Sequence, residues 1–143
     1  MGKSVSGGNE SEDEMIPLIE FIKLLCTILE KHCSLEKKID LDELPAEGGL
    51  YMEIGEGFAD TTYYNKDEIV TFPVLFLCRD VSQERGMEQL WQICNYLRKL
   101  KKYPGGETFS WLDARVTKEP NKIGRDEDRT YLFSCIISCR ICF

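Results

Sequence analysis

The segment from Tyr131 to Phe143 has the most regular alternation of hydrophobic and polar positions in the chain. Every second residue from Tyr131 onward is aromatic, aliphatic or cysteine. Alternation over this length is typical of a β-strand with one buried face. Such a strand must be paired inside a sheet, because an apolar strand left loose would lose its burial and invite edge pairing. The pattern therefore predicts a sheet organised around residues 131–143.

A second alternating segment extends from Glu68 to Arg79, with hydrophobic residues at its even-numbered positions from Val70 to Cys78. Pro73 stands in its middle, and proline cannot donate a hydrogen bond to a β-ladder. This strand is therefore predicted to lie at a sheet edge near Pro73 or to contain a bulge there. Further extended segments are predicted at residues 38–41, 50–54, 59–65 and 109–117, followed by a charged loop at residues 119–129.

The segment from Ile16 to His32 has the three- and four-residue spacing of an amphipathic helix. Additional hydrophobic residues, among them Leu24 and Ile28, extend around much of its circumference. One sheet rarely covers so much apolar surface. The helix is therefore either deeply buried or in contact with another subunit through residues such as Leu24 and Ile28. No membrane span is expected, because the segment is short and contains Glu20 and Lys23.

A second helix is predicted from Asp80 to about Lys102, because Asp80 and Gln83 have the spacing of a capping box. Its predicted buried stripe consists of Met87, Leu90, Trp91, Cys94 and Leu97. Its last turn is basic, with Arg98, Lys99, Lys101 and Lys102. These cations either balance the negative end of the helix dipole or form a phosphate or partner site.

The order of these elements is one helix, two or three strands, a second helix and two final strands. Helices separated by groups of strands favour an α+β fold, with an antiparallel or mixed sheet of about four to five strands and two helices packed on one face. Residues 1–14 consist mainly of glycine, serine and acidic residues and are expected to be a disordered tail or a tag. Residues 15–143 are expected to form a single α+β domain.

The overall charge gives little reason to expect a nucleic-acid partner. The chain has 143 residues and a formal net charge of −7, and part of the excess acid lies in residues 1–14. Non-specific binding to nucleic acid requires a broad basic footprint. One alternative is a small nucleic-acid-binding module that would combine the basic end of the second helix with Tyr96 and Tyr103. Salt-dependent DNA binding would identify such a module.

Seven cysteines are present, an odd number, and no secretory signal precedes them. Cys135 and Cys139 share one strand face at a separation of about 13 Å, which is too far for a disulfide. Cys139 and Cys142 point to opposite faces, so they cannot converge on one metal ion. The cysteines are therefore interpreted as buried structural thiols of a protein in a reducing compartment.

The search for catalytic chemistry gives no strong candidate. His32 is the only histidine in the sequence. It lies at the C-terminal end of a predicted helix, where a histidine interacts favourably with the negative end of the helix dipole. No glycine-rich phosphate loop is present. Four acids lie near strand ends and are the candidate Mg²⁺ ligands of a nuclease: Asp40, Asp42, Glu43 and Glu53. No lysine follows Glu53 as such a site often requires, so we expect no enzyme activity and no catalytic, cofactor or metal site.

Six segments resemble the small minor capsid and tail terminator proteins of long-tailed phages and prophages of Gram-positive bacteria. They are Leu44–Tyr51, Thr62–Lys66, Pro73–Cys78, Ile93–Leu97, Phe109–Ala114 and Ser134–Ile137. Together they extend over nearly all of residues 15–143. The shared residues are structural, so they identify the family more securely than a mechanism.

The resemblance implies a virion structural protein of the head–tail connection, with the tail terminator favoured and another connector or head-completion protein as the alternative. Proteins of this family form a ring, usually a hexamer, on the tail tube, and they require no cofactor. The implied partners are further copies of the chain, the tail tube protein and the head-completion protein, with no membrane and no specific nucleic acid. The implied location is the virion, and the host cytoplasm during assembly.

Candidate interface residues follow from the apolar first helix, the strand interrupted by proline and the two segments expected to project. Besides the first helix, they are Pro73, Tyr63, Tyr64, Asn121, Lys122 and Arg125. Residues 56–67 and 119–129 are expected to project from the ring and to contact the next ring along the tail axis. The associated hypothesis is that deleting residues 121–127 leaves the monomer folded and blocks tail joining.

Overall fold

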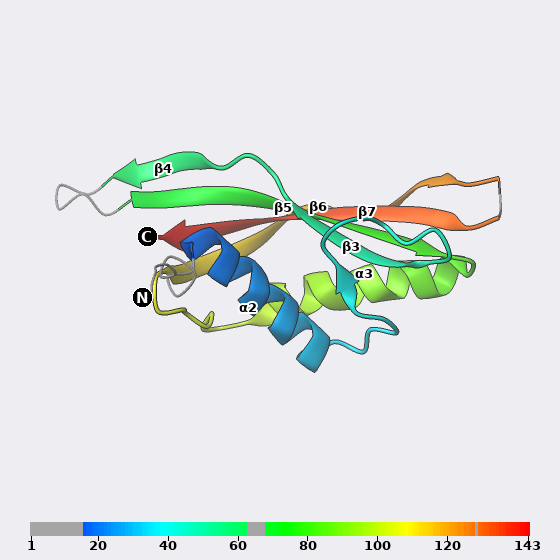
Figure 1. Cartoon of the computed structure of the whole chain (residues 1–143), viewed down its shortest axis with the longest axis horizontal. Helices are drawn as coiled ribbons and strands as arrows, with labels where there is room; N and C mark the ends of the chain where they lie inside the picture. The colour runs from blue at the N-terminus through cyan, green and yellow to red at the C-terminus, as the bar shows by residue number, and fades with distance from the viewer. Residues whose placement is uncertain (1–15, 63–67, 128) are drawn as a thin grey trace, which may run out of the picture.

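The protein folds as two helices packed on one face of a mixed sheet, which confirms the α+β prediction with a sheet somewhat larger than expected (Figure 1). The computed structural model describes residues 16–62, 68–127 and 129–143. Within them the sheet has six strands. In chain order the elements are α2 (Pro17–His32), β2 (Ile39–Asp40), β3 (Gly49–Ile54), β4 (Phe58–Thr62), β5 (Glu68–Asp80), α3 (Gln83–Lys99), β6 (Ser110–Arg125) and β7 (Tyr131–Cys142).

Strand β7 lies inside the sheet, as its alternating pattern predicts. The strand order is β2-β3-β5-β7-β6, and β4 pairs with β5 off this path. Only the β2–β3 pair is parallel among the described strands. β7 pairs with β5 along its whole length, from Tyr131 opposite Asp80 to Cys142 opposite Ile69. On its other side it pairs with β6, so the two last strands form a hairpin.

Strand β5 is central, so the prediction of an edge strand at Pro73 is wrong. β5 pairs with β7 on one side and with β3 and β4 in succession on the other. Pro73 falls at the gap between β3 and β4, where its carbonyl oxygen accepts a hydrogen bond of 2.7 Å from the Gly55 amide. The nitrogen and carbonyl of one strand residue point to the same side, so the missing proline donor faces this gap rather than β7. At this gap, as at a sheet edge, no neighbouring strand needs a hydrogen bond from the N–H group that proline lacks.

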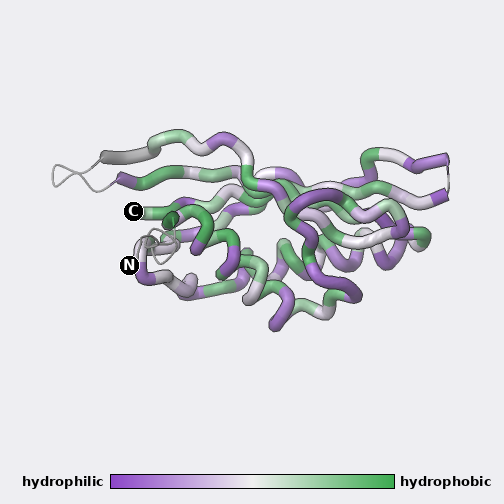
Figure 2. The backbone as a smooth tube through the Cα atoms, in the orientation of Figure 1, coloured by the Kyte–Doolittle hydropathy of each residue, from purple (hydrophilic) through white to green (hydrophobic). Residues whose placement is uncertain are grey.

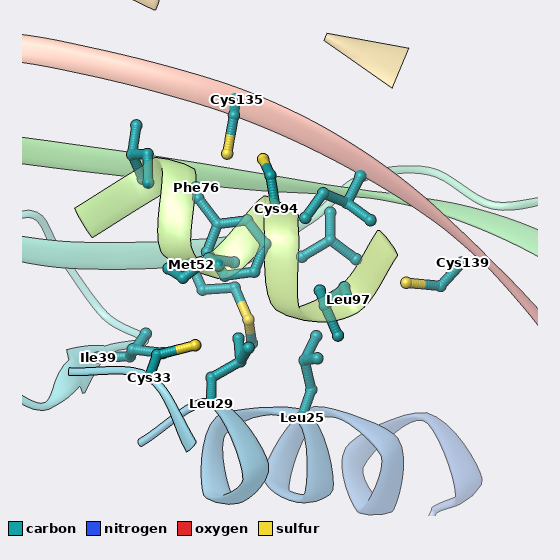
Figure 3. Close-up of a cluster of buried hydrophobic side chains, with 14 of the residues drawn as sticks. Leu25, Leu29, Cys33, Ile39, Met52, Phe76, Cys94, Leu97, Cys135 and Cys139 are labelled. Atoms are coloured by element: carbon teal, nitrogen blue, oxygen red, sulfur yellow. The ribbon is translucent and has the colours of Figure 1, made fainter. Parts of the chain in front are cut away.

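The hydrophobic core lies between the sheet and the two helices. α2 contributes Phe21, Leu25 and Leu29, all fully buried. Phe21 packs edge-on against Phe109 and Trp111, and Leu25 and Leu29 point from α2 toward the core that contains Met52 of β3 and Phe76 of β5 (Figure 3). Figure 2 shows hydrophobic positions gathered where the helices face the sheet, and hydrophilic positions at the tip of the β6–β7 hairpin. Each fully buried leucine or phenylalanine contributes about 1.5–3 kcal/mol by removal of apolar surface from water.

Helix α2 is tied to the sheet at both ends by its own acids. Glu20 accepts hydrogen bonds from the Thr108 hydroxyl at 2.6 Å and from the amides of Glu107 and Thr108. These bonds lower the pKa of Glu20 below its ordinary value of 4.5, the Thr108 hydroxyl having the largest effect. Glu30 accepts from the Ile39 amide at 2.8 Å, which fixes the start of β2. Both carboxylates therefore serve intramolecular contacts.

Helix α3 begins later than predicted and turns a different face to the sheet. Its N-cap is Ser82, whose hydroxyl accepts from the Arg85 amide, while Asp80 bonds to the Ser82 amide and to the Arg85 side chain. The buried positions include Gly86 and Gln89 instead of Met87 and Trp91. Gly86 allows the ring of Phe133 to approach the helix backbone, and this contact fixes which face is buried.

The predicted charged loop at residues 119–129 is wrong, because most of it belongs to β6. β6 continues to Arg125, and the chain direction reverses before β7 begins at Tyr131. The Asp126 amide donates to the Thr130 carbonyl at 2.8 Å, and Arg129 has a φ of 71° in the turn. β6 is an edge strand, where charged side chains prevent pairing with other chains. Such a strand has the composition of a loop, which explains the wrong prediction.

Candidate assembly surfaces

The acids considered as metal ligands are engaged locally. Asp40 accepts hydrogen bonds from the amides of Asp42 and Glu43, which lowers its pKa. Glu53 accepts from the Tyr51 hydroxyl at 2.6 Å. The ring of His32 stacks on Tyr96 at 5.3 Å. Among residues 16–62, 68–127 and 129–143, no three histidine, cysteine or acidic side chains are grouped to hold a metal ion.

All seven cysteines are free thiols, and most lie in the core. Figure 3 shows the sulfur atoms of Cys94 and Cys135 pointing toward each other between α3 and β7. The contact with Cys94 and burial raise the pKa of the Cys135 thiol. Burial also raises the pKa of Cys78 and of Cys139 to about 12. These thiols act as small apolar side chains that pack the helices on the sheet.

The exposed apolar surface of α2 lies at its beginning rather than at the residues selected from the sequence. Leu24 and Ile28 are half-buried and pack against the core. Ile16 and Ile19 are 60% and 41% exposed. They lie on the face opposite the buried stripe together with Lys23. The most exposed apolar surface of α2 therefore lies at Ile16 and Ile19, and the assignment of Leu24 and Ile28 to a subunit contact stays a prediction.

A groove of about 760 Å³ lies between α3 and β6. Met87 and Trp91 line it from α3 and Pro120 from β6. Met87 is 37% exposed and Trp91 is 54% exposed. Sequence reasoning missed this surface because it assigned both residues to the buried stripe. The signal that identifies it is the spacing of Gly86, Gln89, Leu90 and Ile93, which defines the face that contacts the sheet.

The rim of this groove is acidic. Glu84 and Glu88 lie on its α3 side and Glu119 on its β6 side. Glu119 forms an ion pair of 2.8 Å with Arg98. None of the ion pairs in the described ranges involves Glu84 or Glu88. The groove therefore combines an apolar floor with two acids, Glu84 and Glu88, that have no ion pair in the described part of the chain.

The outer face of the sheet, opposite the helices, has a row of half-buried apolar residues. Leu75 and Leu77 of β5 lie beside Ile136 of β7 on this face. Arg140 bonds to Asp113 at 2.8 Å and crosses from β7 to β6. No described helix covers this face (Figure 1). Pro73, a candidate interface residue, lies in the same row and is half-buried.

The β6–β7 hairpin contains the three other candidates that the structure describes. Asn121 donates to the carbonyl oxygens of Glu119 and Ser134, so it fastens the two strands together. Lys122 bonds to Gln83 at 3.2 Å. Lys122 and Arg125 both lie over the ring of Tyr131. These side chains are engaged within the monomer.

Two exposed hydrophobic residues, neither of them a named interface candidate, lie in the segments 56–67 and 119–129 that are expected to make axial contacts. Ile123 in the β6–β7 hairpin is 51% exposed, and Phe58 at the start of β4 is 61% exposed. Tyr63 and Tyr64 lie outside the described residues. An isolated large apolar residue in a polar strand is the signal that would have identified Ile123.

The basic end of α3 does not form an undivided patch. Arg98 is paired with Glu119, which raises the pKa of Arg98, and Tyr103 donates a 2.7 Å hydrogen bond to the Leu97 carbonyl. Lys99, Lys101 and Lys102 are exposed.

Within the described ranges, no helix is long and apolar enough to cross a membrane.

Comparison with known proteins identifies the family. Residues 35–141 match the family model described as bacteriophage tail terminator protein. No curated protein shows significant similarity to the chain. The matched range begins after α2 and ends one residue before the end of β7, so it contains α3 and nearly all of the sheet. The family resemblance in the sequence, the α+β fold and this match agree, and the chain belongs to the bacteriophage tail terminator family, a family of structural proteins of the phage tail.

Proposed function

We propose that the chain assembles as a closed ring, a hexamer, on the end of the tail tube of a long-tailed phage. There it ends tube growth and presents a docking surface to the head-completion protein. Membership in the tail terminator family supports a structural role in the virion. Assembly would occur in the host cytoplasm, and the buried free thiols suit such a reducing compartment.

The observation that carries the proposed ring is the presence of two different apolar surfaces on one helical layer. One consists of Ile16 and Ile19 at the start of α2, and the other of Met87 and Trp91 on α3. α2 begins near the end of the sheet where β7 finishes, whereas α3 begins at the opposite end (Figure 1). Two unlike surfaces favour a heterologous contact, and such contacts generate a ring when the rotation closes.

The two hairpins suit contacts along the tail axis. The β4–β5 pair extends beyond one end of the sheet and the β6–β7 pair beyond the other (Figure 1). The β6–β7 pair carries the exposed Ile123, whereas the exposed Phe58 lies at the inner end of β4, opposite Thr71 of β5. We propose that these ends face the tail tube protein and the head-completion protein.

Electron microscopy of tails made with and without the gene would test this function. Wild-type tails should end in a ring whose mass is six times the 16.5 kDa of one chain. Tails made without the chain should lack this ring, vary in length and fail to join heads. Normal tails and joined virions in the absence of the chain would overturn the proposal. Complementation with the wild-type gene provides the control.

A further inference from the structure

The groove between α3 and β6 has the shape and charge of a receptor for another helix. We infer that it receives the first turns of α2 from a second copy of this chain, with Ile19 packed on Trp91 and Lys23 facing Glu88. This inference rests on the proposed ring and deepens it, because it assigns the residues of the subunit contact.

Trp91 forms the ridge of the receiving surface. It lines the groove with Met87 and Pro120 on one side and a second hollow with His32 and Tyr96 on the other. A half-exposed tryptophan between two depressions can be buried by a partner from both sides. Tryptophan is enriched among the residues that contribute most to binding, particularly in the centre of interfaces. The receiving surface therefore offers both a groove and a central aromatic side chain, Trp91, that a partner can bury.

The acidic rim specifies the charge of the occupant. Glu84, Glu88 and Trp91 follow one another at spacings of four and three, so they form one ridge of the helix. The two glutamates have no ion pair in the described ranges. A complementary segment would place an apolar side chain on Trp91 and a cation one turn away. Complementary charge also fixes the register of such a contact.

The first turns of α2 have this pattern. Ile16, Ile19 and Lys23 follow at spacings of three and four and lie on its exposed face. The acids of α2 do not oppose the match, because Glu20 bonds to Thr108 and Glu30 bonds to the Ile39 amide. Lys23 has no ion pair within the described part of the chain. The exposed face therefore presents isoleucine and lysine.

An antiparallel approach of the two helices aligns the pairs. When Ile19 lies opposite Trp91, Lys23 is one turn further along α2 and Glu88 is one turn back along α3. Helices that pack in this way have axes about 8–10 Å apart. The groove of one subunit cannot take its own α2 start, because α2 and α3 begin at opposite ends of the sheet (Figure 1). The occupant must come from another subunit.

Other cations of the chain are poorer candidates. Lys122 bonds to Gln83 at the edge of the groove and lies over Tyr131, and Arg125 also lies over Tyr131. Arg98 is paired with Glu119. Lys23 differs because an exposed isoleucine lies one turn away on the same face. This combination is what the apolar floor and acidic rim require.

Photocrosslinking in assembled tails tests the contact directly. A benzophenone amino acid replaces Trp91, and mass spectrometry identifies the peptide that it captures in tails assembled from mixed light and heavy subunits. Capture of residues 16–31 from a second copy is the expected result, and a benzophenone at Ile19 should capture residues 83–91. Capture of a different virion protein, or no capture in tails that contain the chain, overturns the inference and leaves the tail role intact. Absence of the chain from tails contradicts both.

Charge exchange provides a second test. Lys23→Glu and Glu88→Lys should each lower incorporation into tails by about tenfold or more, because like charges then face each other. The double variant should recover most of the loss. Lys102→Glu is the matched control, since Lys102 is exposed and lies outside the groove. Thermal unfolding of the purified variants checks that folding is unchanged. Full incorporation of both single variants, or no recovery in the double variant, would overturn the pairing of Lys23 with Glu88.

Discussion

Gly86 of α3 lies against the ring of Phe133 of β7 so closely that a Cβ atom added to the glycine would be 2.3 Å from Cε2 of the phenylalanine. Gly86→Ala should therefore destabilise the protein, although alanine is favoured over glycine in helices by about 1 kcal/mol. Overpacking of a rigid core costs about 1–3 kcal/mol, which exceeds the helix gain over most of this range, so we expect a net loss of up to about 2 kcal/mol in urea unfolding.

The control for this prediction is a double-mutant cycle with Phe133→Leu. The smaller side chain removes the ring that the new methyl group would meet. In that background Gly86→Ala should be neutral or stabilising, and the coupling free energy should be clearly non-zero. Equal effects of the alanine in both backgrounds would show that the two residues are not in contact.

Arg79 connects the turn of the β6–β7 hairpin to the loop before β3. Its guanidinium donates to the Pro45 carbonyl at 2.9 Å and pairs with Asp126 at 3.1 Å. Arg79→Met should cost about 1–3 kcal/mol, because bonds to a charged group are lost from a largely buried side chain. Hydrogen exchange of the amides from Asp126 to Thr130 should become faster. Arg115→Met, at an exposed position of β6, should change neither quantity.

The contact of Glu20 with residues 107–108 predicts a dependence of stability on pH. The folded pKa of Glu20 is lowered below its ordinary value of 4.5, so its ionised form stabilises the folded state above that pH. This contribution is lost as the pH falls through the lowered folded pKa. Wild type should therefore be more stable than Glu20→Gln at pH 7, and the difference should shrink below about pH 4.5. Urea unfolding at several pH values measures it, and a constant difference would contradict the assignment.

The cysteines should differ strongly in reactivity toward a thiol reagent at pH 8. Burial raises the pKa of Cys78 and Cys139 to about 12 and that of Cys26 and Cys33 to about 11, so few thiolates form. Cys142 is partly exposed on the outer sheet face and should react first. The core cysteines should react only at the rate of unfolding. Cys142→Ser should abolish the fast phase, and its persistence would contradict this order.

The parts of the fold predictable from sequence are those in which one face of an element is buried and the other is not. The alternation in β7 and the spacing of Phe21, Leu25 and Leu29 in α2 follow directly from such burial. The face of α3 did not follow, because Trp91 is hydrophobic and yet exposed, while Gln89 is polar and buried with its amide bonded to Asp80 at 3.4 Å. Contacts with residues far away in the sequence decide both the exposure of Trp91 and the burial of Gln89.

The candidate surfaces were less predictable than the fold. Positions at the start and in the middle of α2 are alike in being hydrophobic, so the sequence does not separate Leu24 and Ile28 from Ile16 and Ile19. Only the packed structure shows that Leu24 and Ile28 pack against the core while Ile16 and Ile19 remain exposed. The hypothesis that residues 121–127 can be deleted without unfolding also changes, because Lys122 pairs with the buried Phe133 across the hairpin. A substitution such as Ile123→Ser, at an exposed position, tests the hairpin without removing a strand.

The position of β7 between two strands that precede it in the chain has a consequence for biosynthesis. β5 and β6 both leave the ribosome before the strand that pairs with each of them. Until then β5 has an open edge along its whole length, and such an edge invites wrong pairing. A nascent or truncated chain that lacks β7 would therefore have no complete sheet on which to pack α3. Only full-length subunits should then be competent to enter a tail, which makes the order of synthesis a form of quality control over assembly.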